Sequence, residues 1–399
     1  MPQPSSLKPT DGASALQPRA SLLELVLLFL KLGSTAIGGP AVHIAMMEEE
    51  VVARRGWLTR EEFLDFLGAT NLIPGPNSTE MAIHVGRVRA GWRGLLVVGV
   101  SSILPAALMV GCLAWAYVRY GALPQIAALL YGVKPVVIVV IAQGALRLGR
   151  SAVKSAGLAV LGVLAVVAAA LGVDALLVLF AAGALAGAVH LRSRLARGNF
   201  SAGVLAAAGG VAAAEAGVVP FSLTLLFLVL LKIGATLFGG GYVLVAFLRS
   251  DLVARLGWLT ERQLLDAVAV GQVTPGPLFT TATFVGYVLG GVPGAVLATV
   301  AIFLPAFVLV AASGPLVSRL RRSSAAGAVL DGINVAALAL MIVVSAQLAR
   351  SAIVDWLTLG LAALGALLLL RYRVNSAWLV LGAAAAGGLM AWLGVVRVH

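Results

Sequence analysis

Pro74-Gly-Pro76 interrupts an apolar stretch in the first half of the chain, and Pro275-Gly-Pro277 interrupts another one 201 residues later. Two further motifs repeat at the same spacing: residues 31–40 (KLGSTAIGGP) return at 232–241 (KIGATLFGGG), and residues 54–59 (RRGWLT) return at 255–260 (RLGWLT). A duplication that keeps helix-breaking residues in register is typical of secondary transporters. The sequence therefore predicts two copies of one structural unit.

The composition indicates a membrane protein. Of the 399 residues, 61% are hydrophobic and only 11% are charged, whereas an average soluble domain has about 25% charged residues. Apolar runs at 95–117, 295–317 and 376–396 match the roughly 20 residues that a helix needs to cross a bilayer. We therefore expect an all-α polytopic membrane protein.

Other classes of protein receive little support. The net charge of +12 comes from arginines in short loops between apolar runs, which the positive-inside rule explains without nucleic acid. One cysteine (Cys112) and four histidines give no basis for a metal site or a disulfide. Because no catalytic or nucleotide-binding motif is present, we expect no enzyme activity and no cofactor, and we expect an ion gradient to supply the energy.

The chain divides into four segments. Residues 1–21 read as a disordered cytoplasmic tail, 22–200 as the first repeat (copy one), 201–221 as a linker, and 222–399 as the second repeat (copy two). Residues 87–93 of copy one include three arginines, whereas the equivalent loop of copy two, 286–294, has no basic residue. This reversed bias predicts two inverted-topology repeats.

Inversion needs an odd number of crossings before copy two. Residues 201–219 can supply the extra span, although they are rich in glycine and include Glu215; a loose linker is the alternative. With this span the chain has about 13 transmembrane spans, and its N-terminus lies in the cytoplasm.

The Pro-Gly-Pro tripeptides predict broken helices, because proline and glycine both disfavour a continuous helix. We expect two half-helices to meet near the middle of the membrane, the second starting at Asn77-Ser78-Thr79 in copy one and near Leu278 in copy two. Thr280 and Thr281 then fall in the first turn. A free helix N-terminus suits an oxyanion. An ordinary loop outside the membrane is the alternative.

Further polar or helix-breaking residues extend this candidate site. Gly38, Gly39 and the triplet 239–241 form a second break in each copy, or alternatively a close helix contact. Lys31 and Lys232 lie in the first span of each copy, where a lysine is costly and usually functional, unless its side chain reaches the interface. The hydroxyl of Tyr242 adds a polar group in copy two.

Four titratable residues occur only in copy one: Glu80, His84, His43 and Glu48. A one-sided set of this kind fits proton coupling. The alternative for each of them is an ordinary polar residue with satisfied hydrogen bonds.

These motifs resemble a known family. Residues 38–45 (GGPAVHIA), Glu50, 54–58 (RRGWL) and 74–77 (PGPN) are similar to the first-half motifs of the chromate ion transporter family. Residues 238–243 (FGGGYV), 257–259 (GWL) and 275–277 (PGP) are similar to its second-half motifs. Two positions differ: Ile37 stands where the family usually has phenylalanine, and Arg249-Ser250-Asp251 replaces a more acidic stretch.

The resemblance implies the long, two-domain form of that family. It also implies export of chromate across the bacterial inner membrane, with sulfate as the related dianion and the proton or membrane potential as driving force. The departures leave the substrate preference open, so a carrier of sulfate or another oxyanion is an alternative. A polytopic membrane enzyme is the alternative from another class, and a homodimer is possible.

We therefore hypothesise alternating access around a site between the copies. The candidate substrate-binding residues are Lys31, Gly38, Gly39, Pro74, Gly75, Pro76, Asn77, Ser78, Thr79, Lys232, Gly239, Gly240, Gly241, Tyr242, Pro275, Gly276, Pro277, Thr280 and Thr281. The proton-coupling candidates are Glu80, His84, His43 and Glu48.

Overall fold

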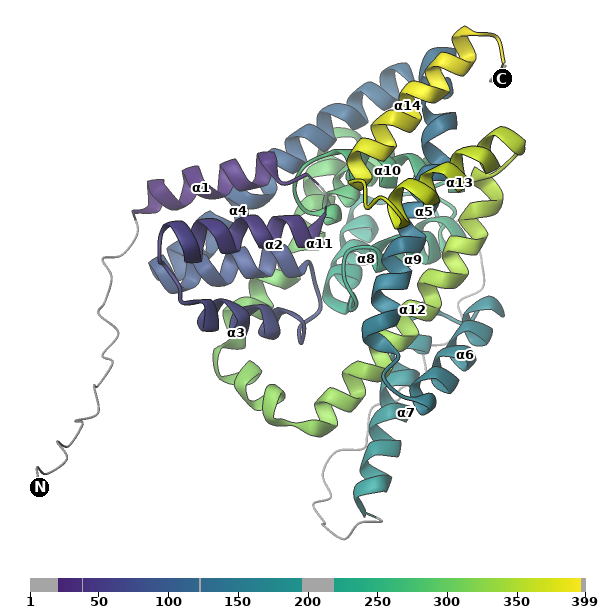
Figure 1. The fold of residues 1–399 in the computed structure, drawn as a ribbon. Coiled ribbons are helices and arrows are strands. Elements are labelled where there is room, and N and C mark those ends of the chain that lie inside the picture. Colours follow the sequence, from purple (N-terminus) through teal and green to yellow (C-terminus); the bar gives the residue numbers. More distant parts are fainter. Residues whose placement is uncertain (1–20, 38, 122, 196–218, 396–399) are drawn as a thin grey trace, which may run out of the picture.

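The computed structural model describes residues 21–37, 39–121, 123–195 and 219–395, and the described residues form helices joined by turns, with no strand among them (Figure 1). Copy one contains α1 (Leu22–Thr35), α2 (Pro40–Glu48), η1 (Glu49–Arg54), α3 (Arg60–Thr70), α4 (Asn77–Tyr120), α5 (Pro124–Ala152), α6 (Ala156–Ala170) and α7 (Ala175–Leu195). Copy two contains α8 (Leu223–Thr236), α9 (Val243–Leu248), η2 (Arg249–Arg255), α10 (Glu261–Val273), η3 (Leu278–Thr280), α11 (Thr281–Arg322), α12 (Ser324–Ala352), α13 (Trp356–Leu370) and α14 (Ser376–Trp392). The prediction of an all-helical fold is confirmed.

The repeated motif Gly-Trp-Leu-Thr starts the corresponding helices α3 and α10 in the same way. Thr59 caps α3, and Thr260 caps α10, each through a reciprocal capping box with the residue three positions later, Glu62 or Gln263. Such a box pairs backbone donors that a helix start leaves free. No helix runs through either Pro-Gly-Pro tripeptide, since α3 ends at Thr70 before α4 begins, and α10 ends at Val273 before η3 begins. The position of these breaks within the membrane stays a prediction.

The long helices α4 and α11 each contain a sharp reversal. Ala90 and Gly91 have non-helical dihedral angles, and so do Gly290 and Gly291 at the equivalent point of α11. Gly91 has a φ of +62°, which glycine adopts without a steric penalty. The Cα of Gly86 packs directly against the carbonyl of Gly94, whereas residues eight apart in a straight helix are about 12 Å apart. The chain therefore doubles back, leaving a short helix (77–89) beside a long one (92–120).

The helices have the lengths and apolar character of a polytopic membrane protein. Five helical segments are long and apolar enough to cross a membrane: Asn77–Tyr120, Pro124–Ala152, Ala175–Arg192, Leu278–Ser313 and Ser324–Ala352. Four shorter helices are also apolar, namely α6, α8, α13 and α14. The number of 13 spans stays a prediction, because most of the proposed extra span, residues 201–218, and most of the tail, residues 1–20, lie outside the described residues.

The two copies exchange their C-terminal helix pairs. In Figure 1, α6 and α7 of copy one lie along α12 of copy two, while α13 and α14 of copy two lie along α5 of copy one. Glycines permit these contacts: Gly132 of α5 packs on the backbone of α14 at Ala383, and Gly332 of α12 packs on that of α7 at Ala182. Small residues let apolar helices approach closely. The pairs α4/α11 and α5/α12 also pack together.

The copies differ in how their central segments are packed. All six residues of α9 and most of α10 are buried, and α10 contacts α5, α12 and α14. In copy one only His43 and Met47 of α2 are buried, and α3 has three buried residues. The segment from α9 to α10 is thus enclosed by the helix core, while the segment from α2 to α3 lies at its side beside α1 and α4 (Figure 1).

The reversal in α4 generates a stability prediction. Gly86→Ala places a methyl group against the Gly94 carbonyl, and overpacking of this kind costs about 1–3 kcal/mol. Gly111→Ala is the matched control, because a methyl group there meets nothing within 4 Å and alanine favours a helix over glycine by about 0.5–1 kcal/mol. In detergent, we expect the melting temperature of the first variant to fall and that of the second to stay or rise. Equal melting temperatures would contradict the contact.

Candidate functional site

Reciprocal backbone hydrogen bonds join the helix breaks of the two copies. The N–H of Gly75 donates to the carbonyl of Leu237 at 2.9 Å, and the N–H of Gly276 donates to the carbonyl of Ala36 at 3.1 Å. Ala36 and Leu237 are the first residues beyond α1 and α8. Each Pro-Gly-Pro break is therefore fixed to the first break of the other copy.

The chemistry of the tripeptide explains why glycine makes this bond. Proline has no N–H, so the glycine supplies the only backbone donor of each tripeptide, and a buried donor needs a partner. Gly75 and Gly276 have φ values of +143° and +98°, which disfavour residues with a side chain. A Cβ on Gly276 would also lie 2.7 Å from the Cβ of Ala106.

A small cavity lies at this junction. Its volume is about 10 Å³, and it is lined by Gly39, Pro40, Tyr242, Gly271, Gln272, Thr274, Gly276 and Leu278. The lining combines the first break of copy one with both breaks of copy two. This is space for about one water molecule, so a larger anion requires the surrounding helices to separate.

Half-helices begin beside this junction at the predicted residues. α4 starts at Asn77 and η3, which leads directly into α11, starts at Leu278. The cap positions are Pro76 and Pro277, and neither start has a side-chain cap. The Asn77 amide instead donates to the side-chain oxygen of Asn71 at 2.7 Å. First-turn N–H groups are thus left uncapped by side chains, as an anion site at a helix N-terminus requires.

The polar residues of these first turns are buried. Ser78, Thr79, Thr280 and Thr281 are at most 2% exposed. The Thr280 hydroxyl donates to the Pro277 carbonyl at 2.8 Å, while the hydroxyls of Thr79 and Thr281 have no hydrogen-bond partner within the described structure. Buried hydroxyls without partners are costly, which is consistent with a site that binds a polar ligand.

Lys31 and Lys232 are each paired with a carboxylate. Lys31 Nζ lies 2.8 Å from Glu50, and Lys232 Nζ lies 2.7 Å from Asp251. Each carboxylate forms a second ion pair with the arginine four residues later. Arg54 lies 3.3 Å from Glu50, and Arg255 lies 3.3 Å from Asp251. The hydrogen bond from Lys31 lowers the pKa of Glu50, so this carboxylate is ionised at neutral pH and compensates the lysine.

Sequence reasoning missed these carboxylates as part of the site. Glu50 and Asp251 are related by the same 201-residue offset as the lysines, and this shared acidity was the signal that could have found them. Both lie in π-helical turns, η1 and η2, and such turns are frequent at functional sites.

The four proton-coupling candidates fall into two groups. Glu80 is fully buried against Gly75, and neither of its carboxylate oxygens has a hydrogen-bond partner within the described structure. His84 lies one turn further along α4 and stacks on Phe66, with ring centroids 5.2 Å apart. His43 is buried on α2, with no partner for either ring nitrogen among the described residues. Glu48 lies apart, 3.6 Å from the exposed Arg60.

The glycines predicted to form an additional break in each copy lie where the chain leaves α1 and α8, which is the first break of each copy along the chain. Gly39 precedes α2, and Gly239, Gly240 and Gly241 lie between α8 and α9. Gly38 lies outside the described residues. The described glycines thus lie between helices in both copies, and their role in binding an anion stays a prediction.

A buried charge network ties α10 to the helices of copy one. Asp266 is 3% exposed, lies 3.3 Å from Lys134 of α5, and accepts a hydrogen bond of 3.0 Å from Tyr117 of α4. The equivalent aspartate of copy one, Asp65, is exposed on α3, and copy two has Asn334 in place of the lysine. Sequence reasoning missed this network, although a lysine within an apolar run was a signal.

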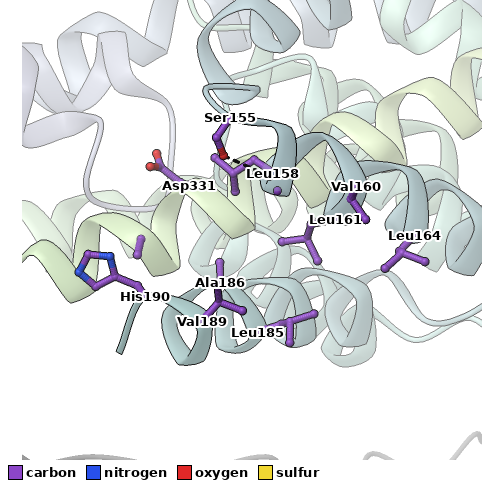
Figure 2. Close-up of a pocket in the computed structure, with 12 residues that line it drawn as sticks. Ser155, Leu158, Val160, Leu161, Leu164, Leu185, Ala186, Val189, His190 and Asp331 are labelled. Atoms are coloured by element: carbon purple, nitrogen blue, oxygen red, sulfur yellow. Dashed lines mark hydrogen bonds between the residues drawn. The ribbon is translucent and has the colours of Figure 1, made fainter. Parts of the chain in front are cut away.

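A larger groove lies away from the helix breaks. Figure 2 shows apolar side chains of α6 and α7 beside α12. Together with residues of α12 they line a space of about 400 Å³. At its edge, Asp331 pairs with Lys154 at 2.6 Å. None of the predicted substrate-binding residues lines this groove, and its apolar lining resembles a lipid-facing surface.

Comparison with known proteins gives the family. The chromate transporter family model matches residues 23–188 and again residues 224–389. The chain belongs to the chromate transporter family. The two matches correspond to copies one and two, so the resemblance seen in the sequence motifs is confirmed.

Named relatives match nearly the whole chain. The chain is 33% identical to a chromate transport protein of Cupriavidus metallidurans over 98% of both chains. It is 32% identical to a chromate transport protein of Pseudomonas aeruginosa, over 97% of this chain and 96% of the relative. A probable chromate transport protein of Synechococcus elongatus is 31% identical over 83% of this chain and 85% of its own. No solved structure matches the chain.

The family supports chromate transport and a multi-pass membrane location. A family of transporters also agrees with the expectation that the chain is not an enzyme.

The network around Asp266 generates a stability prediction. Asp266→Asn leaves the Lys134 charge without its carboxylate, and breaking a buried ion pair costs about 3–5 kcal/mol. Lys134 keeps 18% side-chain exposure, so we expect a loss near the lower value. Combining it with Lys134→Met removes the uncompensated charge and should restore much of the melting temperature. A double variant that melts at the sum of the two single losses would show that the pair does not couple.

Proposed function

We propose that this protein exports chromate across the bacterial inner membrane by alternating access. The observation that carries the proposal is the pair of hydrogen bonds from Gly75 to Leu237 and from Gly276 to Ala36. They bring helix breaks from both copies to one place, as in transporters whose substrate site lies between inverted repeats.

The junction suits an anion. One half-helix begins at Leu278, which lines the cavity, and the other begins at Asn77, two residues after Gly75. A helix N-terminus carries N–H donors and a partial positive charge. Among the described residues that line the cavity there is no carboxylate, whereas the lysine charges of the first helices are compensated by Glu50 and Asp251. In this proposal the lysine clusters keep the segments around the breaks in place, and the backbone supplies much of the anion binding.

The membrane potential favours export of a dianion. Moving one charge through 100 mV changes the free energy by about 2.3 kcal/mol. A doubly charged anion leaving an interior that is negative therefore gains about 4.6 kcal/mol per 100 mV. This supports electrogenic export without a nucleotide.

Glu80 is the first candidate for coupling to protons. An ionised carboxylate without a hydrogen-bond donor is costly in an apolar environment, and Glu80 has no partner within the described structure. It lies against Gly75, the glycine that bonds to copy two. Gain or loss of a proton at Glu80 would therefore act directly on the junction.

The unequal packing of the copies supplies a route for alternating access. The segment from α9 to α10 is enclosed by the helix core and the segment from α2 to α3 lies at its side. Two repeats of opposite orientation that exchange these arrangements would open the junction first to one face of the membrane and then to the other.

The test is a flux assay in proteoliposomes. We expect chromate efflux from protein-containing vesicles, and we expect its rate to rise when the chromate side is made negative. Excess sulfate should inhibit this efflux, and the extent of inhibition measures the affinity for sulfate. Efflux equal to that of protein-free vesicles at every potential would overturn the proposal.

Glu80→Gln tests the coupling residue in the same assay. We expect the response of the flux to a pH gradient to disappear while the response to potential remains. His84→Asn tests the second coupling candidate on the same helix in the same way. A Glu80→Gln protein with a normal response to the pH gradient would exclude Glu80 as the coupling group.

A further inference from the structure

Tyr242 connects three parts of the junction. Its ring packs on Gly144 of α5, with the ring atom Cδ2 2.7 Å from the position of a Cβ on that glycine. Its hydroxyl lies 3.7 Å from the position of a Cβ on Gly39, in the first break of copy one. Tyr242 itself opens α9 and lines the cavity. Side chains on this face of α5 therefore lie beside the cavity.

Arg147 lies on that face of α5. It follows Gly144 by three residues, and residues three apart are neighbours on a helix surface. Leu148, the next residue of α5, packs against Gly239 in the first break of copy two, with its Cδ2 3.3 Å from the position of a Cβ on that glycine. Arg147 takes part in no ion pair among the described residues, whereas Lys31, Lys232 and Lys134 are each paired with a carboxylate.

Gln272 provides a neutral donor in the cavity. It is 6% exposed and lines the cavity together with Tyr242. Its amide nitrogen Nε2 is buried and has no hydrogen-bond acceptor in the described part of the chain. A buried amide donor without an acceptor is costly, and an anion oxygen at this place would supply the acceptor.

We propose that Arg147 is the charged ligand of the transported oxyanion and that Gln272 Nε2 is its neutral partner. This inference rests on the proposed function and names the charged residue of the same site. An arginine guanidinium binds two oxygens of an oxyanion at once. Arg147 is exposed, so its guanidinium is accessible to an anion before the helices separate.

The duplication makes this arrangement one-sided. Copy two has Gln347 at the position equivalent to Arg147, and the Gln347 side-chain oxygen is buried without a partner in the described structure. The pair of copies therefore presents one arginine at this position rather than two. This assigns one principal anion site to the chain.

The experiment compares Arg147→Gln, Arg147→Lys and Arg150→Gln in the proteoliposome assay. Arg150→Gln removes the same charge from the same exposed helix end and controls for the surface potential. We expect Arg147→Gln to raise the KM for chromate at least tenfold, Arg147→Lys to recover part of that loss, and Arg150→Gln to leave KM within twofold. An unchanged KM for Arg147→Gln, or an equal rise for Arg150→Gln, would overturn the inference.

A binding measurement separates this inference from the proposed function. Chromate and, separately, sulfate are added to the purified protein in detergent, and the rise in melting temperature is recorded. We expect both anions to stabilise the wild type and to lose this effect in Arg147→Gln and in Gln272→Leu, which keeps the charge. If wild-type vesicles transport no chromate, the proposed function fails. If the two variants are stabilised as fully as the wild type, the inference about Arg147 and Gln272 fails.

Discussion

Two backbone N–H groups, those of Gly75 and Gly276, constrain the rest of the structure. Gly75 and Gly276 each lie between prolines that have no N–H, and each donates to a carbonyl at the first break of the other copy. A break in an apolar helix exposes polar backbone that lipid cannot satisfy. Each copy therefore depends on the other at the point where its helix is interrupted. The exchange of α6–α7 and α13–α14 between the copies extends the same dependence to the periphery.

The sequence was sufficient for the features that proline, glycine and repeat spacing determine. The starts at Asn77 and Leu278 follow from the prolines before them, and both copies have the predicted breaks. The reversals at Gly91 and Gly291 correspond to the loops that separated the apolar runs. The span count, the inversion and the roles of the site residues stay predictions, because they concern a membrane and ligands rather than the chain alone.

Other features depend on contacts between distant residues. The ion pairs Lys31–Glu50 and Lys134–Asp266 could be predicted only by knowing which helices lie side by side. The sequence also did not predict the unequal packing of α2–α3 and α9–α10, because the motifs of these segments are nearly the same in both copies. A repeated sequence predicts the same order of helices in both copies. It does not predict that the corresponding helices pack differently. The charges also differ: carboxylates pair with the repeated lysines, while Arg147, which has no counterpart in copy two, forms no ion pair with any described carboxylate.

The central claim is that the two copies face opposite sides of the membrane and meet at their breaks. Trp92 and Val292 are equivalent, exposed residues just beyond the reversals of α4 and α11. In a Cys112→Ser background, Trp92→Cys and Val292→Cys are labelled separately with a membrane-impermeant maleimide in intact cells. If the copies are inverted, only Val292→Cys is labelled in intact cells. Trp92→Cys is then labelled only after the membrane has been permeabilised. Labelling of both positions from the same side would contradict the account.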